Sequence, residues 1–294
     1  ERAAAQQRHK VARLVAQVLD DGERRVLRED PRRVRVRRGP VERGIVFHLR
    51  IVAARDREAH AEALLDAQSS VLGGYESFTA FAPTPGEPSL PVPVAQAAAA
   101  NPVPLLIGTT RDEMQLFTVG DSRYQTMDES GLVHFAQERF GVHADDAIDA
   151  YRTLRPGVTP GAIASAIMTD EAFRDPSRRL AEERVRLGHP TWMHWFTWET
   201  PQFGGLLGSC HALDIPFAFH NLSRNGVEAF TGSGREREGI ADFFSGAVTT
   251  FARTGDPGWQ PYDLASRPTM RIDTSPQLVS DPEANVRAVW DRSR

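Results

Sequence analysis

The sequence predicts an α/β fold, and two observations carry this prediction. Short apolar or aromatic runs alternate along the chain with longer segments of helical periodicity, as in folds that pack helices on a largely parallel sheet. The run at 103–108 is apolar at nearly every position, which is typical of a strand buried on both faces. We therefore expect a mixed, mostly parallel sheet with flanking helices.

Helical and extended segments follow one another regularly from residue 58 onward. Helices are expected where apolar residues recur every three or four positions, and strands where short apolar runs lie between turn residues. The segment 82–102, rich in proline, glycine and alanine, indicates a loop with a short Ala-rich turn. The expected elements are a helix at 59–72, a strand at 103–108, helices at 129–155 and 160–187, a strand at 191–198, a helix at 239–254, and strands at 269–273 and 277–280.

The helix at 239–254 has the clearest signature. Its apolar residues fall on one face, and Gly255 and Pro257 follow it, where glycine and proline typically end a helix. We expect this face to pack on the sheet. Its members are Ile240, Phe243, Phe244, Ala247, Val248 and Phe251.

The first 57 residues differ in charge from the rest. They contain 15 arginines, one lysine and eight acidic residues, which give +8, whereas the remainder carries −12. The densest basic run lies at 31–38, helical spacing occurs at 7–19, and 45–52 is a short apolar run typical of a strand. We assign 1–57 as an Arg-rich segment of unclear fold and 58–294 as the α/β domain.

Composition narrows the class of protein. Apolar residues make up 40% and charged residues 25%, and no apolar run reaches the roughly 18–20 residues of a membrane helix. The first residues lack the apolar core of a signal peptide, and a single cysteine excludes an internal disulfide. We expect a cytoplasmic protein of open oligomeric state without membrane or nucleic-acid partners, because no nucleic-acid-binding module surrounds the basic run.

Two polar residues follow predicted strands at the sheet edge where open α/β folds place their sites. Glu113 lies five residues after the strand at 103–108, and His211 lies in the loop after the strand at 191–198. A carboxylate beside a histidine holds the imidazole in one tautomer and stabilises its protonated form, so that the histidine can deprotonate a hydroxyl nucleophile. Taken alone, such a pair is more often structural than catalytic.

The sequence around both residues resembles type B carboxylesterases, the family of cholinesterases and bacterial para-nitrobenzyl-esterase-like enzymes. Residues 103–113 (VPLLIGTTRDE) are similar to the family's acid-loop motif, and residues 211–219 (HALDIPFAF) to its catalytic-histidine motif. Residues 244–257 resemble the helix that follows, and residues 259–263 and 268–273 resemble the terminal segment. The likeness covers roughly residues 60–290 in the family's order and spacing.

The resemblance implies an α/β-hydrolase fold, represented by its C-terminal portion, and a carboxylic ester hydrolase that uses a Ser–Glu–His mechanism on small-molecule esters. Carried over, Glu113 is the triad acid and His211 the general base, while Asp112 is a structural hydrogen-bonding residue. The resemblance implies no cofactor and no metal. The sequence agrees, since it shows no metal-ligand spacing and no Gly-rich phosphate loop.

The sequence departs from the family's pattern at the nucleophile. A Gly-x-Ser-x-Gly elbow should precede Glu113, but the 294 residues contain none, and the Gly-rich oxyanion segment is missing as well. The nearest lookalike, at 231–234, lies after the histidine and indicates a turn, and Ser77 lacks the pattern too. His220 stands where a small residue is expected. We therefore expect a fragment that is inactive alone.

Two other functions stay open, namely a non-catalytic binding or adhesion protein on the same scaffold and an Arg-rich protein that binds anions or nucleic acid. Retention of both Glu113 and His211 argues against the first. Cys210 beside His211 suggests a thiol dyad, but adjacent residues of an extended segment point apart. His194 is interpreted as a packed core residue. Core packing is also favoured, over walls of an acyl pocket, for Trp192, Trp195 and Trp198.

Overall fold

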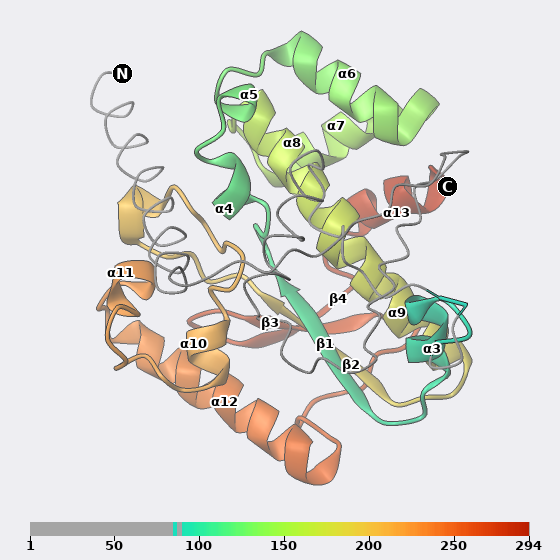
Figure 1. The fold of residues 1–294 in the computed structure, drawn as a ribbon, viewed down its shortest axis with the longest axis vertical. Helices are drawn as coiled ribbons and strands as arrows, with labels where there is room; N and C mark the ends of the chain where they lie inside the picture. The colour runs from blue at the N-terminus through green and yellow to red at the C-terminus, as the bar shows by residue number, and fades with distance from the viewer. Residues whose placement is uncertain (1–84, 87–89, 294) are drawn as a thin grey trace, which may run out of the picture. The chain divides into compact units, whose positions relative to one another are not determined.

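The computed structural model describes residues 85–86 and 90–293. The predicted elements at 7–19, 45–52 and 59–72, the basic run and the proposed boundary at residue 57 lie outside this part. Within it, the chain follows the predicted alternation of strands and helices (Figure 1).

The described strands form one sheet in the order β1-β2-β3-β4. β1 (Leu105–Thr110), β2 (Thr191–Phe196) and β3 (Pro268–Ile272) are parallel, and β4 (Gln277–Ser280) pairs antiparallel with β3. The prediction of a mixed, mostly parallel sheet is confirmed. Because the carboxyl ends of β1 and β2 meet at one edge, the loops that follow these two strands lie side by side.

Strand β1 begins two residues later than predicted. Pro104 has no backbone N–H to donate to a neighbouring strand. The first hydrogen bond toward β2 is donated by the Leu105 N–H to the Pro190 carbonyl at 3.1 Å. Val103 is 64% exposed and lies outside the sheet. The strand ends at Thr110, so that Glu113 follows it by three residues instead of five.

A buried guanidinium fixes the entry into β1. Arg184 is one of the largest fully buried side chains among the described residues. It donates to the carbonyls of Ala98 at 2.8 Å, Asn101 at 2.6 Å and Val103 at 2.5 Å, and to the Thr191 hydroxyl at 3.1 Å. These bonds tie the end of α3 (Val94–Ala100), the helix that replaces the predicted Ala-rich turn, to the start of β2.

The connection from β1 to β2 is helical, and its helices α4 to α8 lie beyond the arrowhead of β1 in Figure 1, whereas α9 runs back beside the strands. The predicted helix at 129–155 is broken in two, because Gly141 has a φ of +55°, a conformation that favours glycine. The elements of the connection are α4 (Gln115–Thr118), α5 (Ser122–Gln125), α6 (Glu129–Phe140), a 3₁₀ turn (Gly141–His143), α7 (Ala144–Leu154), α8 (Pro160–Thr169), a π-helical turn (Asp170–Arg174) and α9 (Asp175–Arg186).

A hydrophobic core joins α6, α7 and α8 to the last helix, α13 (Ala284–Arg292). The rings of Phe140 and Trp290 meet edge to face, with centroids 4.7 Å apart. Burial of this apolar surface holds the helical connection together as a compact unit. The buried members are Leu132, Ala136, Phe140, Ala144, Ala147, Ile148, Tyr151, Ile163, Ala164, Ala166, Ile167, Val286, Val289 and Trp290.

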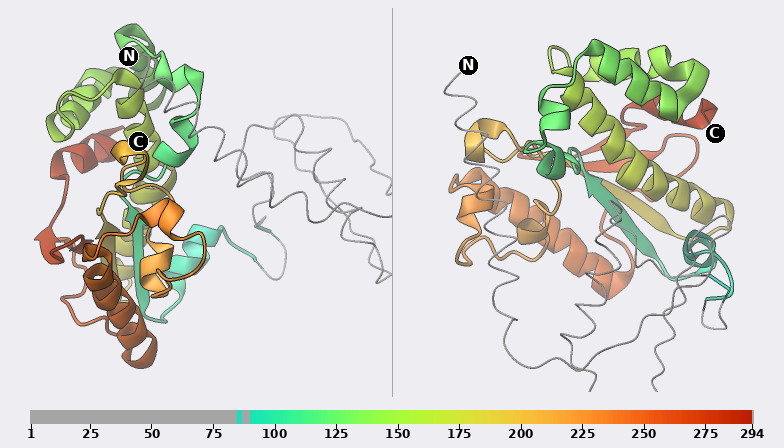
Figure 2. Two further views of the ribbon diagram at one scale, coloured as in Figure 1. Left: turned by 90° about the vertical axis from the view of Figure 1, so that its left-hand side faces the viewer. Right: turned by 45° about the horizontal axis from the view of Figure 1, so that its top comes forward.

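The sheet is covered on its two faces by α9 and α12 (Glu236–Thr254), which lie on opposite sides of the strands in Figures 1 and 2. On one side, Ala181 of α9 packs in a cluster with Met193 of β2. On the other side, Phe244 of α12 contacts His194 at 5.0 Å between ring centroids. The helix ends at Gly255, as predicted, with a left-handed φ of +77°. The short helices α10 (Ile215–Ala218) and α11 (Glu228–Thr231) lie between β2 and α12.

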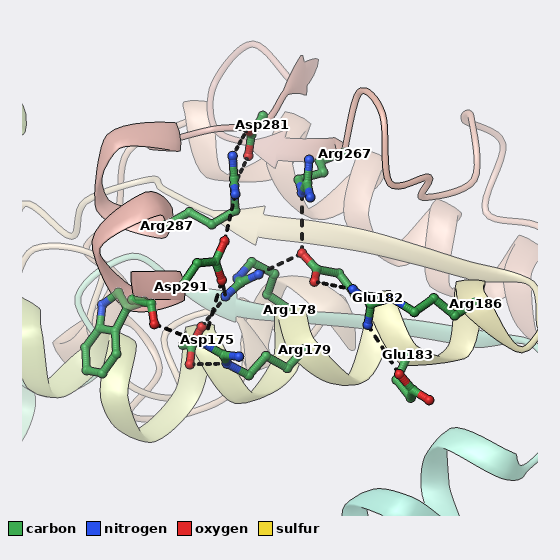
Figure 3. A network of polar contacts seen from close by, with 11 residues as sticks. Asp175, Arg178, Arg179, Glu182, Glu183, Arg186, Arg267, Asp281, Arg287 and Asp291 are labelled. Carbon is green, nitrogen blue, oxygen red and sulfur yellow. Dashed lines mark hydrogen bonds and ion pairs between the residues drawn. The ribbon is translucent and has the colours of Figure 1, made fainter. Parts of the chain in front are cut away.

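An ion-pair network ties α9 to α13 and to the strands β3 and β4 (Figure 3). At its centre, Arg178 contacts Asp175 at 2.5 Å, Glu182 at 2.7 Å and Asp291 of α13 at 2.7 Å. Arg267, before β3, approaches Glu182 at 3.3 Å. Since Asp175 and Glu182 are nearly buried, removal of Arg178 would leave charges without a partner, which is the costly way to break such a pair.

A buried carboxyl group lies beside this network. Tyr151 donates to Asp170 at 2.5 Å, and Trp290 donates to the Tyr151 hydroxyl at 2.9 Å. Burial raises the pKa of Asp170 to about 6, against the opposing effect of the nearby Arg174. The folded protein therefore holds this proton more tightly than the unfolded chain does.

We expect Asp170 to make the protein less stable as the pH rises. The folded pKa exceeds the unfolded one, so the stabilisation is present below about pH 4 and is lost as the pH passes about 6. Relative to Asp170→Asn, the wild-type free energy of unfolding should fall by about 2 kcal/mol between about pH 4.5 and 7.5. Urea titrations of both proteins measure this difference, and parallel curves would contradict it.

Candidate active site

The carboxylate of Glu113 is fixed by the turn that follows β1. Its side chain folds back toward the strand, and Oε1 accepts a hydrogen bond from the Thr110 backbone N–H at 2.7 Å. Glu113 is only 5% exposed. The second oxygen, Oε2, is turned away from the strand toward the loop that follows β2.

His211 meets this second oxygen. Its Nδ1 lies 2.6 Å from Oε2 of Glu113, so the structure brings together the two residues that the sequence singled out. A carboxylate at Nδ1 favours the tautomer with the proton on Nδ1, which leaves Nε2 as an acceptor. Among the described residues, no group hydrogen-bonds Nε2, and the His211 side chain is 41% exposed.

Two phenylalanine rings lie against the imidazole. Phe117, in α4, and Phe173, in the π-helical turn, each have a ring centroid 5.4 Å from that of His211, at an interplanar angle of 46°. These rings restrict rotation of the imidazole about its side-chain bonds and make its surroundings apolar. Sequence analysis missed both residues. Phe117 lies in a helix of only four residues, for which the sequence has no apolar periodicity, so no signal placed it beside His211.

Asp112 joins the two loops that carry the pair. Its backbone N–H donates to the Ser209 carbonyl at 2.8 Å, and its Oδ2 accepts from the Ser209 N–H at 2.9 Å. Burial disfavours its charge, but the guanidinium groups of Arg155 and Arg111 outweigh burial and hold the pKa of Asp112 below its ordinary value. Asp112 therefore makes the structural hydrogen bonds that the resemblance implied.

The remaining sequence candidates lie in the core. Cys210 is fully buried, and burial raises the pKa of its thiol to about 12, so it is a poor nucleophile. Burial lowers the pKa of His194 to about 4, and its ring packs on Phe244. The prediction of core packing is also confirmed for three buried tryptophans, Trp192, Trp195 and Trp198.

A cavity under α9 does not include the pair. Neither Glu113 nor His211 lines it, and its walls come from the first three strands, the π-helical turn, α9, α13 and the loops before β3 and α13. Its charged groups bind one another: Arg174 contacts Glu283 at 2.7 Å and stacks on Trp195, with the guanidinium carbon 3.9 Å from the ring centroid. We interpret it as part of the structural ion-pair region.

The described residues contain no group of three or more histidine, cysteine or acidic side chains arranged to hold a metal ion. No helix in this part of the chain combines the length and apolarity needed to cross a membrane. The chemistry that the described site offers is that of an oriented imidazole base with a buried carboxylate behind it.

Comparison with known proteins shows which family this chain resembles. Residues 53–290 match the model of the carboxylesterase family. Phenmedipham hydrolase of Pseudarthrobacter oxydans is 30% identical over 207 residues, which are 69% of this chain and 41% of that protein. The para-nitrobenzyl esterase of Bacillus subtilis is 30% identical over 218 residues, which are 68% of this chain and 40% of that protein.

Solved structures show the same likeness. The Geobacillus stearothermophilus carboxylesterase EST55 has a TM-score of 0.58 at 32% identity, over 67% of this chain and 42% of that one. A para-nitrobenzyl esterase structure has a TM-score of 0.61 at 29% identity, over 78% and 48%. The chain belongs to the carboxylesterase family, and its fold is that of the α/β-hydrolases. It spans about two-fifths of the length of the curated relatives that it matches.

Proposed function

We propose that this chain supplies the acid and the base of a serine carboxylesterase that hydrolyses small-molecule carboxylic esters. The observation that carries the proposal is the contact of 2.6 Å between His211 Nδ1 and Glu113 Oε2, with Nε2 on the side away from the acid. Membership of the carboxylesterase family supports it.

In this mechanism, His211 Nε2 takes the proton of a serine hydroxyl as its oxygen forms a bond to the ester carbonyl carbon. The resulting imidazolium is stabilised by Glu113, which stays ionised. His211 then gives the proton to the departing alcohol as the ester C–O bond breaks, leaving an acyl-serine. Water then attacks the acyl-serine in the same way, with His211 taking a proton from the water and giving it to the serine oxygen as the acyl bond breaks. This step releases the carboxylic acid product and regenerates the serine.

A chimaera tests the proposal. Residues 90–290 of this chain replace the matching part of the Bacillus subtilis para-nitrobenzyl esterase, which contributes the rest of the protein. We expect the folded chimaera to hydrolyse nitrobenzyl esters above the background of the relative truncated at the same position. A folded chimaera that does not exceed this background would contradict the proposal.

The chain by itself is expected to be inactive. The 294 residues contain no Gly-x-Ser-x-Gly elbow, and a histidine without its serine cannot form an acyl-enzyme. We expect it to hydrolyse short-chain nitrophenyl esters no faster than its His211→Ala variant, and to leave an organophosphonate serine probe unreacted. Stoichiometric labelling of a serine, with a burst that His211→Ala abolishes, would reveal a nucleophile within the sequence; Ser77 and Ser209 are then the first to replace.

A purely adhesive role is less well supported, because it gives no reason for a buried carboxylate to hold a half-exposed histidine at 2.6 Å. The basic run at 31–38, which motivates an anion-binding role, lies outside the described residues. A steep dependence of nucleic-acid binding on salt would favour that role.

A further inference from the structure

The loop that carries Glu113 and the loop that carries His211 are joined by a third residue, Asp112, through its carboxylate. Asp112 is the residue before Glu113, and its partner Ser209 lies two residues before His211. The backbones pair as a parallel bridge between Asp112 and Cys210. A displacement of Asp112 therefore moves both members of the pair relative to one another.

This contact is closely packed. Gly208 has a φ of +56°, and a Cβ built on it would lie 2.6 Å from Oδ2 of Asp112. The loop thus reaches the carboxylate only because this residue has no side chain. The Ser209 hydroxyl adds a hydrogen bond to the carbonyl of Phe196, the last residue of β2, at 2.8 Å. The Ser209 hydroxyl thus attaches the loop to the end of β2, and the Ser209 N–H attaches it to Asp112.

Asp112 is itself held from outside both loops. Arg155, the residue that ends α7, places its guanidinium Nη1 2.5 Å from Oδ1, and its Nη2 lies 3.4 Å from the Arg111 carbonyl. The Asp112 side chain is 9% exposed and that of Arg155 is 21% exposed. Arg111 occupies only the other oxygen, Oδ2, which it shares with the Ser209 N–H.

The partners of the two arginines differ. Arg111 divides its guanidinium between Asp112 and Glu199, whose side chain is 54% exposed, at 2.5 Å. The contact with Arg155 is the only one at Oδ1 among the described residues, and it comes from the helical connection. Loss of Arg155 would leave a buried carboxylate half-paired, which is strongly unfavourable unless the carboxylate moves or takes up a proton.

We infer that Arg155 is a positioning residue for the active site, which acts through Asp112 to hold the His211 loop against the Glu113 turn. Its catalytic meaning rests on the proposed function, whereas its effect on the geometry of the pair does not. The end of α7 thus holds the two loops together from outside the sheet and outside both loops.

Nuclear magnetic resonance of the full 294-residue chain, labelled with ¹⁵N-histidine, tests this role of Arg155 without an activity assay. The Nδ1 proton of His211, held by a carboxylate at 2.6 Å, should give a slowly exchanging downfield signal that is identified by its loss in His211→Ala. In Arg155→Met, which keeps the alkyl stem, this signal should lose at least about half its intensity, because breaking a charged pair frees the loop. Arg155→Lys should restore most of it.

A matched control lies on the same helix. Arg152 pairs with Glu129 on the surface, so Arg152→Met removes an arginine and an ion pair from α7 without touching Asp112. We expect its His211 signal to equal that of the wild type. In Arg155→Met labelled uniformly with ¹⁵N, the Ser209 amide should also exchange with solvent deuterium at least about ten-fold faster than in the wild type, since its acceptor is no longer fixed.

An unchanged His211 signal and an unchanged Ser209 exchange rate in folded Arg155→Met would overturn the inference, as would an equal loss in Arg152→Met. If Arg155→Met does not fold, Arg155→Lys carries the test. Lysine cannot span both Asp112 and the Arg111 carbonyl, so Ser209 exchange should rise at least about three-fold, and an unchanged rate would overturn the inference. If the chimaera is inactive but Arg155→Met still weakens the His211 signal and speeds Ser209 exchange, the proposed function is wrong and the positioning role of Arg155 stands.

Discussion

Replacing His211 by alanine is expected to lower kcat/KM of the esterase chimaera by about 10⁴- to 10⁶-fold. The imidazole is the group that both accepts the serine proton and returns it to the leaving alcohol, and loss of a triad member has effects of this size. Glu113→Gln should cost about 10⁴-fold, since an amide favours the wrong tautomer at Nδ1. Hydrolysis of a nitrobenzyl ester under single-turnover and steady-state conditions measures both changes.

The chain contains its own control for this experiment. His220 and Asp242 form a second histidine–carboxylate pair, with Nε2 2.8 Å from Oδ1, on the surface between α10 and α12. His220→Ala removes an imidazole beside a carboxylate but does not touch the candidate site, so kcat/KM should stay within about two-fold of the parent. Activity that survives His211→Ala, or falls equally in His220→Ala, would refute the assignment of the base.

Phe244→Ala is expected to destabilise the 294-residue chain by about 3–5 kcal/mol, the usual cost of truncating a buried phenylalanine. Phe244 is 2% exposed, and its ring lies 5.0 Å from that of His194 and 6.2 Å from that of Phe196, measured between centroids. The substitution leaves a cavity between α12 and β2 that these rigid rings fill poorly. The midpoint and slope of urea unfolding give the change in free energy of unfolding.

Phe243, the preceding residue of α12, is the matched control. It is only partly buried and stacks on Trp259, with ring centroids 6.4 Å apart. Phe243→Ala should therefore cost less than half as much as Phe244→Ala, because less apolar surface returns to water. Both residues belong to the predicted apolar stripe, so equal costs would mean that the two rings lose the same apolar contacts, which would contradict the deeper burial of Phe244.

The sequence predicted where strands occur more accurately than it predicted their first and last residues. An apolar run and an aromatic run sufficed for β1 and β2, but Pro104 moved the start of β1, and only the pairing partner settles where a ladder begins. The break at Gly141 was visible as a glycine, but a glycine inside a helical pattern does not by itself fix a positive φ. The local sequence pattern predicts whether a segment is a helix or a strand, whereas hydrogen bonds to other parts of the chain determine its first and last residues.

The candidate site shows the same division. Glu113 and His211 were found because they stand in motifs next to strands, and the distance between them follows from the parallel pairing of β1 and β2. Arg155 was not found, because a single arginine at the end of a helix has no pattern that points to a partner 43 residues earlier. Contacts of this kind depend on how α7 packs, which periodicity does not specify.

The π-helical turn at Asp170–Arg174 separates α8 from α9 within one continuous helical rod. An α-helix turns by about 100° per residue, whereas a π-helical turn needs more residues to complete one turn, so the side chains that follow it lag behind the directions they would have on an uninterrupted helix. Within this turn, Phe173 contacts His211, and its neighbour Arg174 stacks on Trp195. The turn therefore changes the direction of the α9 side chains relative to those of α8, so that α8 can pack in the helical core while α9 packs on the sheet.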